Sequence, residues 1–184
     1  MVVRANPIVI KRPTGTTHLC NVITMDMQSV EEKLITHWQA DGLAIQSGVT
    51  GDQISSFEKK YQVVMPSDLK SYFLQVNGMK TTLNDCKDKE GFSFWSLSEV
   101  KTVELELNQV RIEPYATQNL ESFFVFVDYF DWSWAYAIYL SSEPTAQNQV
   151  ILIGKEHPIK IADSFTAFVD LYISNSAKLY GRGE

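Results

Sequence analysis

The order in which hydrophobic periodicities follow one another constrains the fold of this chain more than any other feature. Apolar residues recur at helical spacing between residues 29 and 78 and again after residue 163. Between these parts, residues 92–161 contain short alternating or continuous apolar runs, which are typical of half-buried and fully buried strands. This order predicts an α+β fold: an antiparallel sheet packed against N-terminal helices, with a closing C-terminal helix.

Capping signals locate the N-terminal helices. Ser29 with Glu32, and Thr50 with Gln53, have the spacing of a capping box, in which each side chain satisfies a backbone N–H group at a helix start. A third helix is expected after Pro66. The apolar stripes that these helices would bury are Val30, Leu34 and Trp38; Ile54, Phe57 and Tyr61; and Leu69, Tyr72, Phe73 and Val76.

Glycines are expected to close two of these helices. Gly42 follows the first helix, and Asn77-Gly78 follows the third. Glycine adopts the left-handed backbone conformation that commonly ends a helix at little cost. We therefore expect Gly78 to have a positive φ angle.

The strand-like part contains one ambiguous segment. Strands are expected at residues 92–95, 123–127, 134–140, 150–153 and 159–161, and a last helix near Asp163. In residues 99–110, alternating Val103, Leu105 and Leu107 favour a strand. The spacing of Val100, Val103, Leu107 and Val110 favours a helix, so both alternatives remain open.

Length and composition suit a single domain. The chain has 184 residues, of which 45% are hydrophobic and 12% aromatic, which is enough for one well-packed core. Pro7, Pro13 and Gly15 interrupt the first stretch, so residues 1–27 are expected to form an N-terminal arm and residues 28–184 one domain. No apolar run approaches the roughly eighteen residues of a membrane span, and no membrane contact is expected.

The cysteines and the N-terminus favour a cytoplasmic protein. Cys20 and Cys86 lie far apart and belong to no CxxC or Cys/His pattern, so both are expected to be free thiols in a reducing compartment. Only Ile8, Val9 and Ile10 lie between the basic residues at the start, which is too short for the apolar region of a signal peptide.

The distribution of charge points to a class of partner. The net charge of −6 argues against a nucleic-acid-binding protein, whose affinity would come from a basic surface. The excess lies in residues 84–131, which carry ten Asp and Glu against four Lys and Arg. Such a cluster is either a solvated face or a docking patch for a basic protein.

Catalytic and metal-binding patterns do not form. His18, His37 and His157 have no ligand-type spacing. Asp128 and Asp131 lie among aromatic residues and suit acid/base chemistry on a sugar, but Asp residues also satisfy the backbone of a turn between strands. We favour the turn, and we expect no enzyme activity, no cofactor and no metal.

Residues 50–78, TGDQISSFEKKYQVVMPSDLKSYFLQVNG, resemble the SUKH superfamily of Smi/Knr type. The matching positions are Phe57-Glu58, Met65-Pro66, Tyr72-Phe73-Leu74 and Asn77-Gly78, followed by Trp95, Leu97 and Glu99, the hairpin segment FFVFVDYFDWSWAYAIYL, and Ser164-Phe165. The likeness extends over roughly residues 29–175 in the family's order. Met65 departs from the commoner leucine, which changes little because both are flexible apolar side chains.

The resemblance implies a non-catalytic interaction fold. Many bacterial members resemble immunity proteins that bind and block toxins, often nucleases, whereas fungal members resemble regulators of cell-wall synthesis. We expect an immunity protein that neutralises a basic protein toxin, with a regulatory scaffold as the alternative. The residues expected to contact the partner are Trp95, Glu104, Glu106, Asp128, Asp131 and Trp132. The toxin's identity and the oligomeric state stay open.

Overall fold

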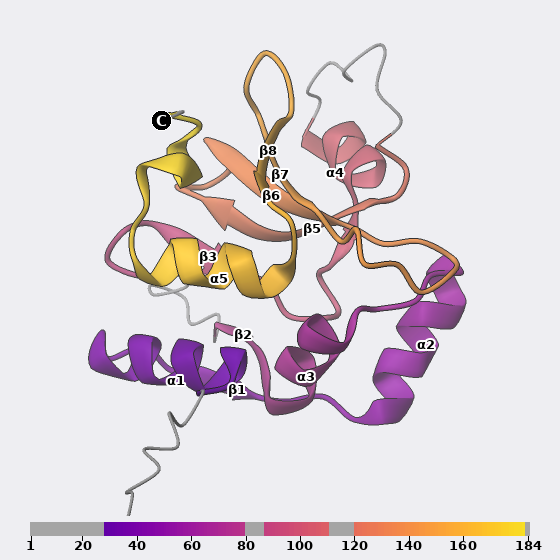
Figure 1. The fold of residues 1–184 in the computed structure, drawn as a ribbon, viewed down its shortest axis with the longest axis horizontal. Coiled ribbons are helices and arrows are strands. Elements are labelled where there is room, and N and C mark those ends of the chain that lie inside the picture. The colour runs from indigo at the N-terminus through magenta and orange to yellow at the C-terminus, as the bar shows by residue number, and fades with distance from the viewer. Residues whose placement is uncertain (1–27, 80–86, 111–119, 183–184) are drawn as a thin grey trace, which may run out of the picture.

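The computed structural model describes residues 28–79, 87–110 and 120–182 (Figure 1). The expected N-terminal arm, residues 1–27, lies outside the described residues, and so do Cys20 and Cys86. The first elements are α1 (Val30–Ala40), β1 (Ile45–Ser47), α2 (Gly51–Tyr61), α3 (Ser67–Gln75) and β2 (Val76–Met79). Then come β3 (Phe92–Phe94), β4 (Lys101–Thr102), α4 (Val103–Val110), β5 (Phe123–Tyr129), β6 (Trp134–Tyr139), β7 (Val150–Ile153), β8 (Ile159–Ala162), α5 (Phe165–Ile173) and the short 3₁₀ helix η1 (Ala177–Tyr180).

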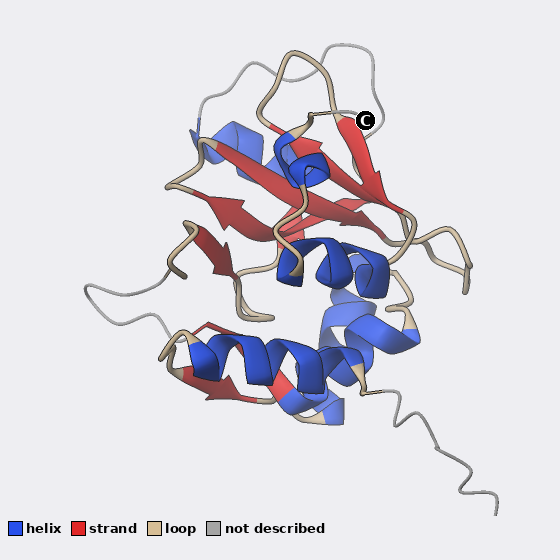
Figure 2. Ribbon diagram, turned by 60° about the vertical axis from the view of Figure 1, so that its left-hand side comes forward, coloured by secondary structure: helices blue, strands red, loops and turns tan. Residues whose placement is uncertain are grey.

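The strands of the main sheet run antiparallel in the order β3-β5-β6-β7-β8, and β4 also pairs with β5. One face of this sheet packs against α5, with α1 and α3 beyond it, and the other face packs against α4 (Figure 1, Figure 2). In β7, Val150 and Leu152 belong to the first core, whereas Ile151 and Ile153 belong to the second. The strand is therefore buried on both faces, which explains its continuous apolar sequence. The predicted α+β fold is confirmed.

Both capping boxes form as predicted. Ser29 Oγ accepts a hydrogen bond from the Glu32 backbone, and the Glu32 carboxylate accepts one from the Ser29 backbone. Thr50 and Gln53 make the same exchange at the start of α2. These bonds satisfy backbone N–H groups that a helix start otherwise leaves without partners.

The predicted end of the third helix is wrong. The helix stops at Gln75, and Val76, with φ −140° and ψ 132°, begins strand β2, which pairs antiparallel with β1. Val76 is fully buried, as its helical spacing suggested, but an extended residue buries it equally well. Gly78 has the predicted positive φ, 77°, inside a strand rather than at a helix cap.

Residues 99–110 contain both of the structures that the sequence left open, a short strand and then a helix. Lys101 and Thr102 pair with β5, and the chain then enters α4. Thr102 Oγ1 accepts a hydrogen bond from the Leu105 backbone, which helps to start this helix. Val103 and Leu107 face the second core, one helical turn apart.

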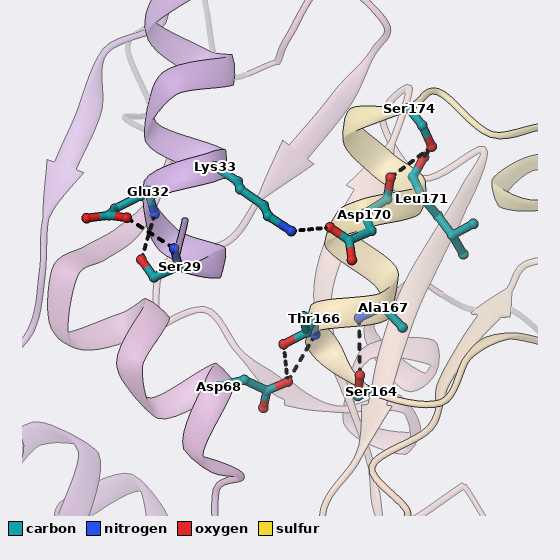
Figure 3. A network of polar contacts seen from close by, with 10 residues as sticks. All are labelled: Ser29, Glu32, Lys33, Asp68, Ser164, Thr166, Ala167, Asp170, Leu171 and Ser174. Atoms are coloured by element: carbon teal, nitrogen blue, oxygen red, sulfur yellow. Dashed lines mark hydrogen bonds and ion pairs between the residues drawn. The ribbon is translucent and has the colours of Figure 1, made fainter. Parts of the chain in front are cut away.

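Helix α5 is anchored to the N-terminal helices at two points, one at its N-terminus and one in its second half (Figure 3). Asp68 Oδ2, from α3, accepts hydrogen bonds from the backbone N–H and hydroxyl of Thr166 at 3.0 and 2.9 Å. Lys33 of α1 forms an ion pair with Asp170 at 2.7 Å. The helix begins at Phe165, capped by Ser164, close to the predicted start. A carboxylate at a helix N-terminus also complements the positive end of the helix dipole.

A buried polar network fixes the loop that leads into β3. Trp38 Nε1 donates a hydrogen bond to Tyr172 Oη at 2.9 Å, and Tyr172 Oη donates one to Asp88 Oδ2 at 2.5 Å. The other oxygen of Asp88 accepts hydrogen bonds from the backbones of Glu90 and Phe92. Asp88, one of the ten acidic residues in segment 84–131, is therefore buried in the core.

Candidate partner-binding site

Trp95 connects the end of β3 to β5. Its backbone N–H donates a hydrogen bond to the Phe126 carbonyl at 2.9 Å, and its Nε1 donates one to Asp128 Oδ2 at 2.8 Å. The ring is half-buried beside that of Trp132, with 6.0 Å between the ring centroids. Two partly exposed tryptophans and a carboxylate therefore meet at one end of the sheet.

Asp128 is partly buried. Burial raises the pKa of its carboxyl group, and hydrogen bonds from Trp95 Nε1 and the Trp132 backbone N–H lower the pKa in part. The nearby carboxylate of Asp131 raises this pKa further, while Lys87 lowers it. The side chain therefore fixes the geometry of Trp95 and Trp132 as well as contributing charge.

The turn between β5 and β6 has an unusual backbone. Phe130, Asp131 and Trp132 have φ angles of 42°, 49° and 69°, all in the left-handed region. Each such residue other than glycine costs on the order of 1–3 kcal/mol, and such strain concentrates at binding and active sites. Hydrogen bonds from the Ser133 backbone N–H and hydroxyl to the Phe130 carbonyl hold the turn.

Contacts with the loop before β3 hold the turn from outside. The Phe130 backbone N–H donates a hydrogen bond to the Gly91 carbonyl at 2.9 Å. The Phe130 ring packs against Gly91, where a Cβ atom would lie only 2.5 Å from a ring carbon. Lys87 and Asp131 form an ion pair at 2.5 Å. The Asp131 side chain is nevertheless 81% exposed, and Phe130 is 51% exposed, so both remain available to a partner.

We name these five residues the hairpin surface: Trp95, Asp128, Phe130, Asp131 and Trp132. They come from the end of β3, the end of β5 and the turn into β6. The surface combines aromatic side chains with carboxylates, a composition suited to protein contacts, since aromatic anchors dominate the binding energy of many interfaces.

A groove with a volume of about 600 Å³ begins at Trp95. Its walls are formed by Lys60 and Tyr61 of α2 on one side and by Trp95, Glu99, Lys101, Leu105 and Glu106 on the other. A second hollow of about 500 Å³ continues along α2 and shares Lys60, Tyr61, Ser98 and Val100 with the first. We name the part at Trp95 the Trp95 groove.

Glu106 lies in this groove and not on an exposed surface. It is 5% exposed and forms an ion pair with Lys101, whose Nζ lies 5.8 Å from the centre of the Trp95 ring. The expectation that Glu106 is an exposed acid is therefore wrong. The cause is that α4 directs Glu106 toward Lys101 in β4. The sequence left residues 99–110 open between strand and helix, so it could not show which side chains face β4.

The structure brings together four of the six predicted residues: Trp95, Asp128, Asp131 and Trp132. Glu106 joins them only through Lys101 and Trp95. Glu104 is exposed on α4, and no described contact links it to the others.

Sequence reasoning missed the contributions of Phe130, Lys87, Lys101 and Tyr61. Phe130 carries a usable signal, because an aromatic residue between two turn-forming aspartates is an exposed aromatic once the turn is recognised. Tyr61 carries no such signal, since it belongs to a helix that meets Trp95 only in the folded chain.

Metal-binding clusters and membrane-spanning helices do not occur in the part of the chain that the structure describes. Among residues 28–79, 87–110 and 120–182, no group of three His, Cys, Asp or Glu side chains could hold a metal ion. In the same residues, no helix is both long and apolar enough to cross a membrane. The His37 ring packs edge-on against Tyr172, His157 is exposed in a loop, and His18 lies outside the described part of the chain.

Comparison with known proteins supports the resemblance seen in the sequence. Residues 48–171 match the model of the SMI1 / KNR4 family (SUKH-1), and this match spans more than half of the chain. It includes all six predicted partner-binding residues and the groove from α2 to α4. No curated protein matches the chain. The chain therefore belongs to the SMI1 / KNR4 family (SUKH-1).

Proposed function

We propose that this chain is a binding protein that neutralises a basic protein toxin by covering part of the toxin with the hairpin surface. The observation that carries the proposal is the left-handed run Phe130-Asp131-Trp132 at the tip of the β5–β6 hairpin. Four-residue hairpin loops are most often built around a type I turn, whose central residues have negative φ angles. The strained turn instead presents an aromatic ring and a carboxylate to solvent, which supports a role in recognition.

The chemistry of the surface supports a basic partner. Asp131 is largely exposed, and Glu104 and Glu121 are exposed in the same acidic segment of the chain. Exposed carboxylates accelerate the encounter with a positively charged protein and select against an acidic one. A toxin that acts on nucleic acid carries such positive charge around its active site.

The aromatic residues supply the short-range part of binding. Phe130 is exposed, and Trp95 and Trp132 are half-buried, so each has apolar area that a partner would cover. Aromatic anchors held in place lose little conformational entropy on binding. The hydrogen bond from Trp95 to Asp128 and the ion pair of Asp131 with Lys87 hold this surface in one arrangement before the partner arrives.

A cytoplasmic location goes with this proposal. Cys20 and Cys86 have neither the spacing of a metal site nor that of a disulfide framework, which supports a reducing compartment. In the cytoplasm this chain would bind a toxin that has entered the cell.

The test uses the protein encoded next to the gene for this chain. The purified neighbour is assayed for toxicity and for nuclease activity, with and without this chain, and binding is measured by titration calorimetry. We expect a stoichiometric complex that suppresses the activity. Phe130→Ala should weaken binding at least about tenfold, as expected for an aromatic anchor.

The matched control is Leu74→Ala. Leu74 is an exposed apolar residue of similar exposure, 43% against 51% for Phe130, but it lies on α3, away from the hairpin. Binding should be unchanged in this variant. A complex that forms without suppressing any activity would favour the alternative role of a regulatory scaffold, and equal effects of the two variants would reject the hairpin surface as the interface.

A further inference from the structure

The Trp95 groove contains a lysine held between a ring and a carboxylate. Lys101 Nζ lies 5.8 Å from the centre of the Trp95 ring and forms an ion pair with Glu106. A cation within about 6 Å of an indole face is attracted by the negative face of the ring. The groove is therefore built for a positive charge, and a side chain of the protein itself occupies that position.

The Glu106 carboxylate is buried and held by an ion pair. Its Oε2 contacts the Lys101 ammonium directly. A buried carboxylate is costly unless hydrogen bonds accompany its ion pair. Glu106 also lines the groove beside Lys101, so a cation that displaces the Lys101 ammonium would meet this carboxylate.

We propose that the Trp95 groove receives an arginine side chain of the protein partner, and that Lys101 holds this place in the free protein. The proposal rests on the proposed function only in that the partner is a basic protein. Arginine fits better than lysine because its planar guanidinium stacks on an indole ring and offers several N–H donors to a carboxylate. Lys101 offers Glu106 only a point charge.

The surrounding charges favour this occupant. Glu99 lines the same wall of the groove, and Glu104 is exposed one helical position away from Leu105, which also lines it. Glu99 Oε2 accepts hydrogen bonds from the Ser96 backbone and hydroxyl, which fix its orientation. On the opposite wall, Lys60 Nζ lies 4.6 Å from the centre of the Tyr61 ring.

The experiment uses blocked tripeptides as probes: acetyl-Gly-Arg-Gly-amide, and the same peptide with citrulline, which has the shape of arginine without its charge. The full chain is titrated with each peptide, and the indole N–H signal of Trp95 is followed by NMR. Trp95→Phe identifies that signal among the four tryptophans. We expect the arginine peptide to shift this signal saturably and the citrulline peptide to leave it in place.

Lys101→Met separates a specific site from a general attraction. Removal of the resident lysine should tighten arginine-peptide binding by roughly three- to fivefold, the size of one exposed cation–π contact. Lys60→Met is the matched control, because it removes the same charge from the opposite wall while Lys101 stays in place. It should change the affinity by less than about a factor of two. Lys101→Gln, which keeps a donor for Glu106, replaces Lys101→Met if that variant does not fold.

Three results would overturn the proposal: equal shifts with both peptides, equal tightening by the Lys101 and Lys60 variants, or no Trp95 shift in either wild type or Lys101→Met. A shift that appears only in Lys101→Met supports it, since the site is then occupied in the wild type. None of these outcomes depends on the toxin. If the peptide test fails but the toxin complex forms, only the arginine site in the Trp95 groove is rejected. If no toxin binds, the proposed function is rejected and the peptide result still stands.

Discussion

Tyr172 Oη and Asp88 Oδ2 lie 2.5 Å apart inside the protein, and Trp38 Nε1 donates a hydrogen bond to the same hydroxyl at 2.9 Å. Burial raises the pKa of Tyr172, so its hydroxyl stays protonated and donates to the carboxylate. This relationship joins α1, α5 and the loop before β3. The hydrogen bond to Asp88 therefore holds the loop before β3 in place. This loop also contains Lys87 and Gly91, which contact the hairpin surface.

Tyr172→Phe is expected to lower the free energy of unfolding by about 1–3 kcal/mol, since it leaves both Trp38 Nε1 and Asp88 Oδ2 without this partner. Tyr180→Phe is the control: its hydroxyl donates to Asn175 at the surface, so its loss should change stability by no more than about 0.5 kcal/mol. Urea denaturation measures both. Equal effects would mean that the buried network contributes nothing particular.

A second prediction concerns pH and Asp128. Burial raises the pKa of this carboxyl group, so the folded protein holds the proton more tightly than the unfolded chain does. The stabilisation is fully present below the ordinary pKa of about 3.9 and is lost as the pH rises through the raised value. Asp128→Asn mimics the protonated form and cannot titrate. Wild type should therefore lose stability relative to Asp128→Asn as the pH rises through this window.

Denaturation at several pH values between 3 and 8, with both proteins under the same conditions, measures that difference. The comparison cancels groups that both proteins share, including Asp163, whose pKa Lys160 lowers. If the free energy of unfolding of the wild type rises relative to that of Asp128→Asn as the pH increases, burial does not raise the pKa of Asp128.

Two glycines provide a matched pair of substitutions. Gly78 has a φ of 77°, and a Cβ atom there would lie 2.6 Å from the Phe94 carbonyl oxygen, whereas a Cβ at Gly51 would meet nothing within 4 Å. Gly78→Ala should therefore cost at least about 1 kcal/mol, and Gly51→Ala should be neutral or slightly stabilising. Thermal melting of the two variants measures the difference. An unchanged melting temperature for Gly78→Ala would show that a side chain at this position causes no strain.

The two glutamates of α4 should respond differently to charge reversal. Glu106→Lys places a second positive charge in a buried site beside Lys101 and should cost about 2 kcal/mol or more. Glu104 is exposed, so Glu104→Lys should stay within about 0.5 kcal/mol. Chemical denaturation of each variant tests the assignment, and a fully stable Glu106→Lys protein would place that side chain at the surface.

Local signals in the sequence were sufficient for much of the fold. The capping boxes at Ser29 and Thr50 join residues only three positions apart. The sequence pattern alone therefore predicts the hydrogen bonds. The apolar runs of β5 and β6 also predict their strands, because both faces of the sheet are covered.

Long-range contacts decided what the sequence did not reveal. Val76 fits the stripe of α3 by its spacing, but pairing with β1 makes it extended. Glu106 is polar and so was expected at the surface, yet Lys101 from the neighbouring strand neutralises it inside the groove. The turn at Phe130 lacks the glycine or asparagine that usually marks a left-handed turn, so its strain appears only in the backbone angles.

The most direct test of the central claim is the rate at which this chain associates with its purified toxin at low and at physiological ionic strength. We predict that wild type slows as salt screens exposed charges over about 8 Å, and that Asp131→Lys slows association roughly three- to tenfold at low salt with little change in dissociation. Glu143→Lys should match wild type, since this exposed acid lies in the β6–β7 connection, at the opposite end of β6 from the hairpin turn. An association rate indifferent to salt and to Asp131→Lys would contradict docking of a basic partner on the hairpin surface.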